Sequence, residues 1–99
     1  MFGPYIDLPP GCYDAQIFFA PAKPPSGRAV MDIAVNYGNK LLAEKAITLP
    51  GEDNRSLRIR FETSAEDRGV EVRLMCEPGF RAVVIGVEIK PDLPAPAAI

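Results

Sequence analysis

The feature that most constrains the fold is a strict alternation of apolar and polar residues near the end of the chain. Between residues 69 and 77 the apolar positions recur at every second residue, namely Val70, Val72, Leu74 and Cys76. Side chains of a β-strand point to opposite faces with a period of two. This run therefore predicts a strand with one buried face.

A second alternating run follows after the segment Glu77–Phe80, which reads EPGF. Its apolar row is Val83, Ile85, Val87 and Ile89. Proline presets φ and glycine accepts a positive φ, so this segment suits a tight turn. We expect the two runs to pair as a β-hairpin, and the rest of the chain to pack against it.

Four further segments alternate in the same way, and loops rich in proline, glycine or polar residues separate them. They are residues 11–20, 28–37, 40–49 and 56–63. The segment KLLAEKAITL at 40–49 also contains good helix formers, so a single helical turn is the alternative there. We expect a strand, because the segment is short and follows a tight turn. Residues 5–8 lie between prolines and predict an edge strand or an arm.

These segments predict an all-β fold, an antiparallel β-sandwich of about six to seven strands that is jelly-roll or immunoglobulin-like. The expected domain spans residues 1–91, and residues 92–99 form a flexible tail or linker stub because they offer little to bury. The rows expected to face the core are Tyr13, Ala15, Ile17, Phe19, Met31, Ile33, Val35, Tyr37, Leu57, Ile59, Phe61, Val72, Leu74, Ile85 and Val87.

Composition removes several classes of function. The formal net charge is −2, whereas nucleic-acid binding needs a clustered basic surface. No apolar run is long enough to span a membrane, and no signal peptide is expected. The chain has no histidine, which is the commonest general base and transition-metal ligand. We expect no cofactor and no metal, and two reduced thiols, Cys12 and Cys76, as in a cytoplasmic protein.

Polar residues collect on the rows opposite the core. The candidate ligand-binding residues are Asp14, Gln16, Asp32, Asn36, Arg58, Arg60, Glu71 and Arg73. Carboxylates, amides and guanidinium groups hydrogen-bond to sugar hydroxyls, so these rows can form a glycan-binding groove. A solvated sheet face with cross-strand ion pairs is the commoner outcome, and the sequence leaves both open. Catalysis by a carboxylate pair such as Asp32 and Glu71 is the least favoured alternative.

The chain opens with Gly3-Pro4-Tyr5 and LPPGCY at residues 8–13, has GVEVR at 69–73, and closes with residues 83–89 followed by Pro91. These segments resemble the first, penultimate and last strands of carbohydrate-binding-module-like β-sandwich domains, which are attached to bacterial glycosyltransferases of polysaccharide biosynthesis. The resemblance implies a jelly-roll-like accessory module without catalytic activity that binds a glycan or docks against a larger parent enzyme. The alternative is a structural or protein-interaction domain that self-associates through an exposed strand.

Overall fold

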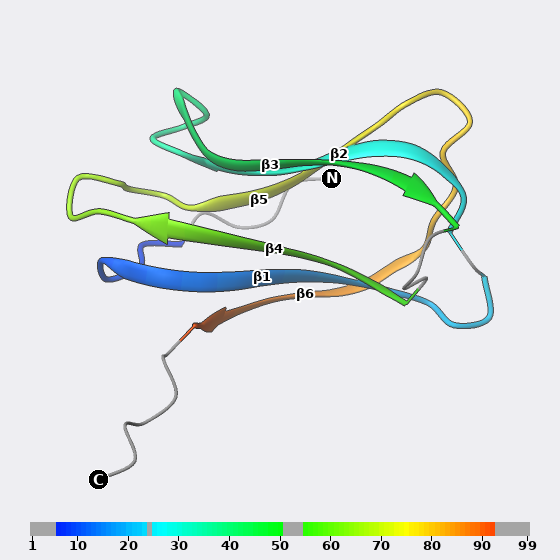
Figure 1. Cartoon of the computed structure of the whole chain (residues 1–99), viewed down its shortest axis with the longest axis horizontal. Coiled ribbons are helices and arrows are strands. Elements are labelled where there is room, and N and C mark those ends of the chain that lie inside the picture. The colour runs from blue at the N-terminus through cyan, green and yellow to red at the C-terminus, as the bar shows by residue number, and fades with distance from the viewer. Residues whose placement is uncertain (1–5, 24, 51–54, 93–99) are drawn as a thin grey trace, which may run out of the picture.

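The computed structural model describes residues 6–23, 25–50 and 55–92, and this part of the chain contains six strands and no helix. The strands are β1 (Gly11–Phe19), β2 (Gly27–Val35), β3 (Lys40–Leu49), β4 (Ser56–Thr63), β5 (Glu71–Cys76) and β6 (Val84–Pro91). They form two antiparallel three-stranded sheets, ordered β4-β1-β6 and β3-β2-β5, which face each other as a β-sandwich (Figure 1). The prediction of an all-β sandwich is confirmed.

The segment at 40–49 is a strand along its whole length. It pairs with β2 from Gly27 opposite Leu49 to Val35 opposite Lys40, so the helical alternative is not formed. Backbone pairing with β2 outweighs the weak helix propensity of the segment. The β2–β3 hairpin turns at residues 36–39, where Asn36 and Tyr37 have φ of 56° and 58°. Because β2 ends at Val35, Tyr37 lies in this turn with 85% of its surface exposed, and its predicted place in the core was wrong.

The predicted hairpin between residues 70–76 and 83–89 does not form. The expected turn is present, since the Phe80 N–H donates to the Glu77 carbonyl at 3.0 Å and Gly79 has φ of 90°. However, β5 pairs with β2 and β6 pairs with β1, so the chain crosses from one sheet to the other after the turn. Alternation shows which face of a strand is buried, but it does not show which strand it pairs with.

The inner row of β6 also differs from the prediction. Phe18 pairs with Gly86 and Phe19 with Val84, so the register shifts at this point and skips Ile85. A bulge of this kind turns the extra residue away from its row, and Ile85 is 63% exposed. Val84 packs on the core in its place. Val87 stays opposite Ile17, but it is on the outermost strand and is 36% exposed.

The other predicted inner rows do fill the interior. The confirmed core residues are Tyr13, Ala15, Ile17, Phe19, Met31, Ile33, Val35, Leu57, Ile59, Phe61, Val72 and Leu74. The Tyr13 ring stacks on Phe61 with a centroid distance of 5.7 Å, and its hydroxyl donates to the Pro9 carbonyl. Outside the strands, Ile6 forms an antiparallel bridge with Val70, which places the predicted N-terminal arm beside the start of β5.

The bulge in β6 can be tested by comparing two isoleucine-to-alanine variants. Ile17→Ala removes a side chain that is 1% exposed, and should lower the free energy of unfolding by about 2–5 kcal/mol because it leaves a cavity. Ile85→Ala should cost under about 1 kcal/mol because the side chain is in solvent. Urea unfolding measures both values, and equal losses would contradict the outward position of Ile85.

Candidate functional site

The structure divides the predicted binding residues between the two outer surfaces of the sandwich. Those on the outer face of the β4-β1-β6 sheet are Asp14, Gln16, Arg58 and Arg60. Those on the outer row of the β3-β2-β5 sheet are Asp32, Glu71 and Arg73. Asn36 lies in the β2–β3 turn, where its side-chain oxygen accepts a hydrogen bond from the backbone N–H of Arg68 at 3.0 Å. The eight residues therefore do not form one groove.

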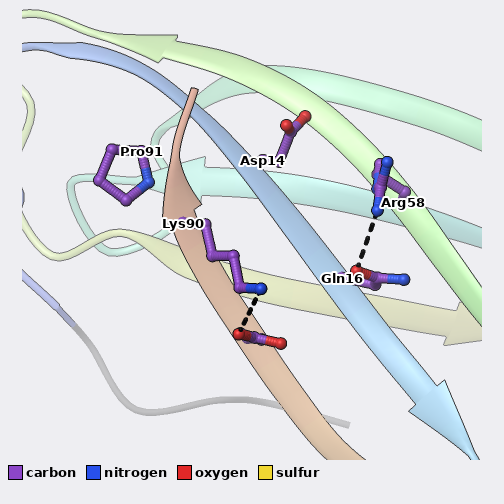
Figure 2. A pocket seen from close by; sticks show the side chains of 6 residues that line it. Asp14, Gln16, Arg58, Lys90 and Pro91 are labelled. Carbon is purple, nitrogen blue, oxygen red and sulfur yellow. Dashed lines mark hydrogen bonds and ion pairs between the residues drawn. The ribbon is translucent and has the colours of Figure 1, made fainter. Parts of the chain in front are cut away.

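Cross-strand register assembles a polar row on the β4-β1-β6 face. Gln16 stands at its centre, with Arg58 of β4 opposite it on one side and Glu88 of β6 on the other. Arg58 Nη2 donates to Gln16 Oε1 at 3.4 Å (Figure 2). Gln16 Nε2 donates in turn to Ser56 Oγ at 2.8 Å. These bonds hold the amide at a defined position while leaving the Glu88 carboxylate beside it.

The neighbouring row along β1 contains a carboxylate that the protein does not use. Asp14 lies between its register partners Arg60 and Lys90. Both cations have other partners, because Arg60 Nη2 pairs with Asp92 and Lys90 Nζ pairs with Glu88 Oε1 at 3.1 Å. Within the described residues, the Asp14 side chain makes no hydrogen bond or ion pair. Its oxygens are therefore available to accept hydrogen bonds from a ligand.

These two rows border a shallow groove of about 140 Å³ (Figure 2). Its lining residues are Asp14, Gln16, Arg58, Glu88, Lys90 and Pro91. The predicted set contained the first three of these residues and lacked those from β6. The alternation in β6 does place Glu88 and Lys90 opposite the inner Val87 and Ile89. Glu88 and Lys90 were not assigned to the predicted site, because β6 was expected to pair with β5.

An aromatic residue continues the same row of β1. Phe18 is half-buried, and its register partners are Ser56 and Gly86, which have small side chains or none. A Cβ built at Gly86 would meet no atom within 4 Å, so the space beside β6 is open at this point. An aromatic ring next to a polar groove offers an apolar face for stacking.

The opposite sheet carries a buried ion pair instead of an open groove. Arg73 Nε and Nη2 donate to the two carboxylate oxygens of Asp32 at 2.7 and 2.9 Å. Asp32 is 0% exposed, and Glu71 is also buried. Asp32 and Glu71 therefore lie on the row opposite the core, as predicted, but they are buried and do not face solvent. The bidentate pair of Arg73 and Asp32 satisfies both carboxylate oxygens and links β2 to β5 across the sheet.

A further polar cluster, which the sequence did not reveal, fixes the β4–β5 connection. Asp67 Oδ2 accepts hydrogen bonds from the Ser64 backbone N–H at 2.8 Å and from Ser64 Oγ at 3.1 Å. Asp67 Oδ1 accepts from Lys40 Nζ at 3.0 Å. The Ser64 backbone N–H first, and the Lys40 ammonium next, hold the pKa of the Asp67 carboxyl below its ordinary value of 3.8. This cluster joins the turn to the start of β3.

No group of three or more His, Cys, Asp or Glu residues that could hold a metal ion occurs among residues 6–23, 25–50 and 55–92. The same residues contain no helix that could cross a membrane. Both cysteines are free, and Cys76, which was expected on an inner row, is exposed at the end of β5. The predicted tail beyond Asp92 lies outside the described residues.

Known proteins do not add to this description. Protein-family models, curated proteins and solved structures were each compared with the chain, and none of them matches it. The groups that the two sheets bring together are therefore the basis for any proposal of function.

The buried ion pair should dominate the polar contribution to stability. Asp32→Ala leaves the Arg73 guanidinium without its carboxylate, and should lower the free energy of unfolding by about 3–5 kcal/mol. The control is Glu77→Ala, which breaks the pair between Arg28 and Glu77, whose side chains are 72% and 52% exposed. That change should cost under about 1 kcal/mol. A similar cost for both variants in urea unfolding would contradict the assigned role of Asp32.

The Asp67 cluster predicts a pH dependence. A lowered folded-state pKa favours the charged carboxyl, so the stabilisation is complete above the unfolded-state pKa and is lost as the pH falls through the lower folded-state pKa. Asp67→Asn should therefore be less stable than the wild type at neutral pH, and the difference should shrink as the pH falls below 3.8. Urea unfolding at a series of pH values measures this difference. Glu66→Gln, an exposed change in the same turn, is the control, and a constant difference for Asp67→Asn at all pH values would oppose the prediction.

Proposed function

We propose that the protein is a non-catalytic carbohydrate-binding accessory module, which holds a glycan on the outer face of the β4-β1-β6 sheet. The observation that carries the proposal is the groove where β4, β1 and β6 contribute a guanidinium, an amide, two carboxylates and an ammonium group. A sugar hydroxyl both donates and accepts hydrogen bonds. A surface that mixes donors and acceptors at close spacing matches this requirement.

The shape of the groove supports a binding role. Its volume of about 140 Å³ is below the roughly 300–1,000 Å³ of pockets that enclose small molecules. A shallow site on a sheet face suits one or two units of a longer chain that passes over the surface. Phe18 lies beside the groove and supplies the aromatic face on which a sugar ring can stack.

The larger partner that we propose is the one implied by the sequence resemblance. The carbohydrate-binding-module-like domains that the sequence resembles are attached to bacterial glycosyltransferases of polysaccharide biosynthesis. In the proposed role the module acts for such an enzyme in the cytoplasm, either by binding the glycan chain or by docking on the enzyme itself. The open carboxylate of Asp14 favours the glycan, because it is an acceptor that the module leaves unused.

Titration of labelled protein with a panel of neutral oligosaccharides tests the proposal. Amide shifts should be confined to β1, β4 and β6 near the groove. Asp14→Asn preserves the shape but removes the charged acceptor, and should weaken binding by about tenfold or more, since a hydrogen bond to a charged group contributes about 1.5–3 kcal/mol. Glu44→Gln, an exposed change on β3, should bind normally. The absence of shifts with every oligosaccharide, or binding that Asp14→Asn leaves unchanged, would refute the proposal.

A second function, self-association, is favoured by a separate observation. In the part of the chain that the structure describes, β6 pairs only with β1, so its other edge carries backbone groups free to pair with another strand. Val83, Ile85 and Val87 expose apolar side chains along it. Sedimentation distinguishes the two functions: a concentration-dependent dimer that Ile85→Lys abolishes, without any response to sugar, supports the second.

A further inference from the structure

A larger pocket lies at the end of the sandwich where the β1–β2 loop meets the β5–β6 connection. Its volume is about 440 Å³, and it shares no residue with the groove on the sheet face. Its lining residues are Lys23, Ser26, Phe80, Arg81, Ala82 and Val83. Both loops lie at the right-hand end of the sandwich in Figure 1.

Backbone contacts hold the two loops together, so the pocket is formed before any ligand arrives. The N–H groups of Ser26 and Arg81 donate to each other's carbonyl oxygens, at 2.8 Å each. Gly27, with φ of 106°, packs so closely that an added Cβ would lie 2.8 Å from the Cα atom of Phe80. The Ala20 N–H also donates to the Val83 carbonyl at 2.8 Å. A site fixed in this way loses little entropy on binding.

The rim of the pocket is positively charged. Lys23 and Arg81 are exposed, and their side chains make no ion pair or hydrogen bond with the described residues. Residues 20–26 contain no acid, and residues 77–83 contain only Glu77. Glu77 is already paired with Arg28 at 2.9 Å. Among the described residues, these two cations therefore line one pocket without an acidic partner, and their local field attracts anions.

One wall of the pocket is apolar. Phe80 and Ala82 pack partly against the core and are half-buried, so each also has surface outside it. Val83 beside them is 41% exposed. A ligand that reaches the two cations can thus place a ring or a short apolar group against this wall.

We propose that this end pocket binds an organic anion. Arg81 and Lys23 hold the carboxylate or phosphate group, and Phe80 and Val83 contact an attached ring or short apolar chain. The guanidinium of Arg81 can donate two parallel hydrogen bonds to such a group, and the Lys23 ammonium adds a point charge. The end pocket shares no residue with the glycan groove, so either proposal can be refuted without affecting the other.

The test uses the full chain labelled with nitrogen-15 and titrated with phenyl phosphate to about 10 mM, a range that detects dissociation constants near 1 mM. Saturable shifts are expected at Ser26 and at residues 80–83. Arg81→Ala and Lys23→Ala should each weaken binding by about threefold to tenfold, as expected for partly exposed charged contacts. Arg68→Ala, which removes the same charge from the β4–β5 connection, should leave the affinity unchanged.

Three outcomes would overturn the proposal. The first is no saturable shift with phenyl phosphate. The second is an equal loss of affinity in Arg68→Ala, which would indicate general attraction of anions by the surface. The third is equal affinity for inorganic phosphate and phenyl phosphate, which would exclude the contact with Phe80 and Val83. An unchanged spectrum of the variants without ligand shows that each remains folded.

Discussion

Burial of the apolar rows on the two middle strands is the constraint on which the remaining structure depends. Ala15, Ile17 and Phe19 of β1, and Met31, Ile33 and Val35 of β2, are almost completely removed from solvent. A slip of one residue in either strand would exchange its two faces and drive Asp14 and Gln16, or the corresponding residues of β2, into the interior. The register is therefore set by the core. The polar rows on the outer faces are a consequence of that register, and the groove exists because the flanking strands follow it.

Within the described part of the chain, an aspartate on the outer row is paired in one sheet and unpaired in the other, because the cations on the neighbouring strands have different partners. In the β3-β2-β5 sheet, Arg73 lies opposite Asp32 and can reach both of its oxygens, so a bidentate pair forms and is buried. In the β4-β1-β6 sheet, Asp14 also has a cation on each side, but Asp92 and Glu88 engage those cations. Competition between acids for the neighbouring cations therefore decides which carboxylate forms an ion pair within the protein and which stays available to a ligand. That difference separates a stabilising pair from a candidate binding group.

Periodicity predicted the six strands and most of the core, since each of these depends on residues adjacent in sequence. Long-range pairing is a different matter. The pattern in residues 83–89 cannot show that β6 pairs with β1, or that the register skips Ile85 beside Phe18. For the same reason Glu88 and Lys90 were absent from the predicted site, although they face the same groove as Asp14. Burial of Asp32 was missed because an aspartate on an outer row is exposed unless a partner on the next strand can satisfy it.

The connections between strands explain why the ends of this sandwich can carry a separate site. Only the β2–β3 turn joins neighbours within one sheet, and every other link carries the chain across to the opposite sheet. Such links span a layer spacing of about 10 Å and leave the ladders, so their backbone groups pair with other loops, with side chains or with water. Ser26 and Arg81 do so, and their pairing brings Lys23 close to Phe80. The end pocket thus depends on the loops, whereas the groove depends on strand register. Changes in loop sequence can consequently alter the end pocket, while the core and the groove on the sheet face stay intact.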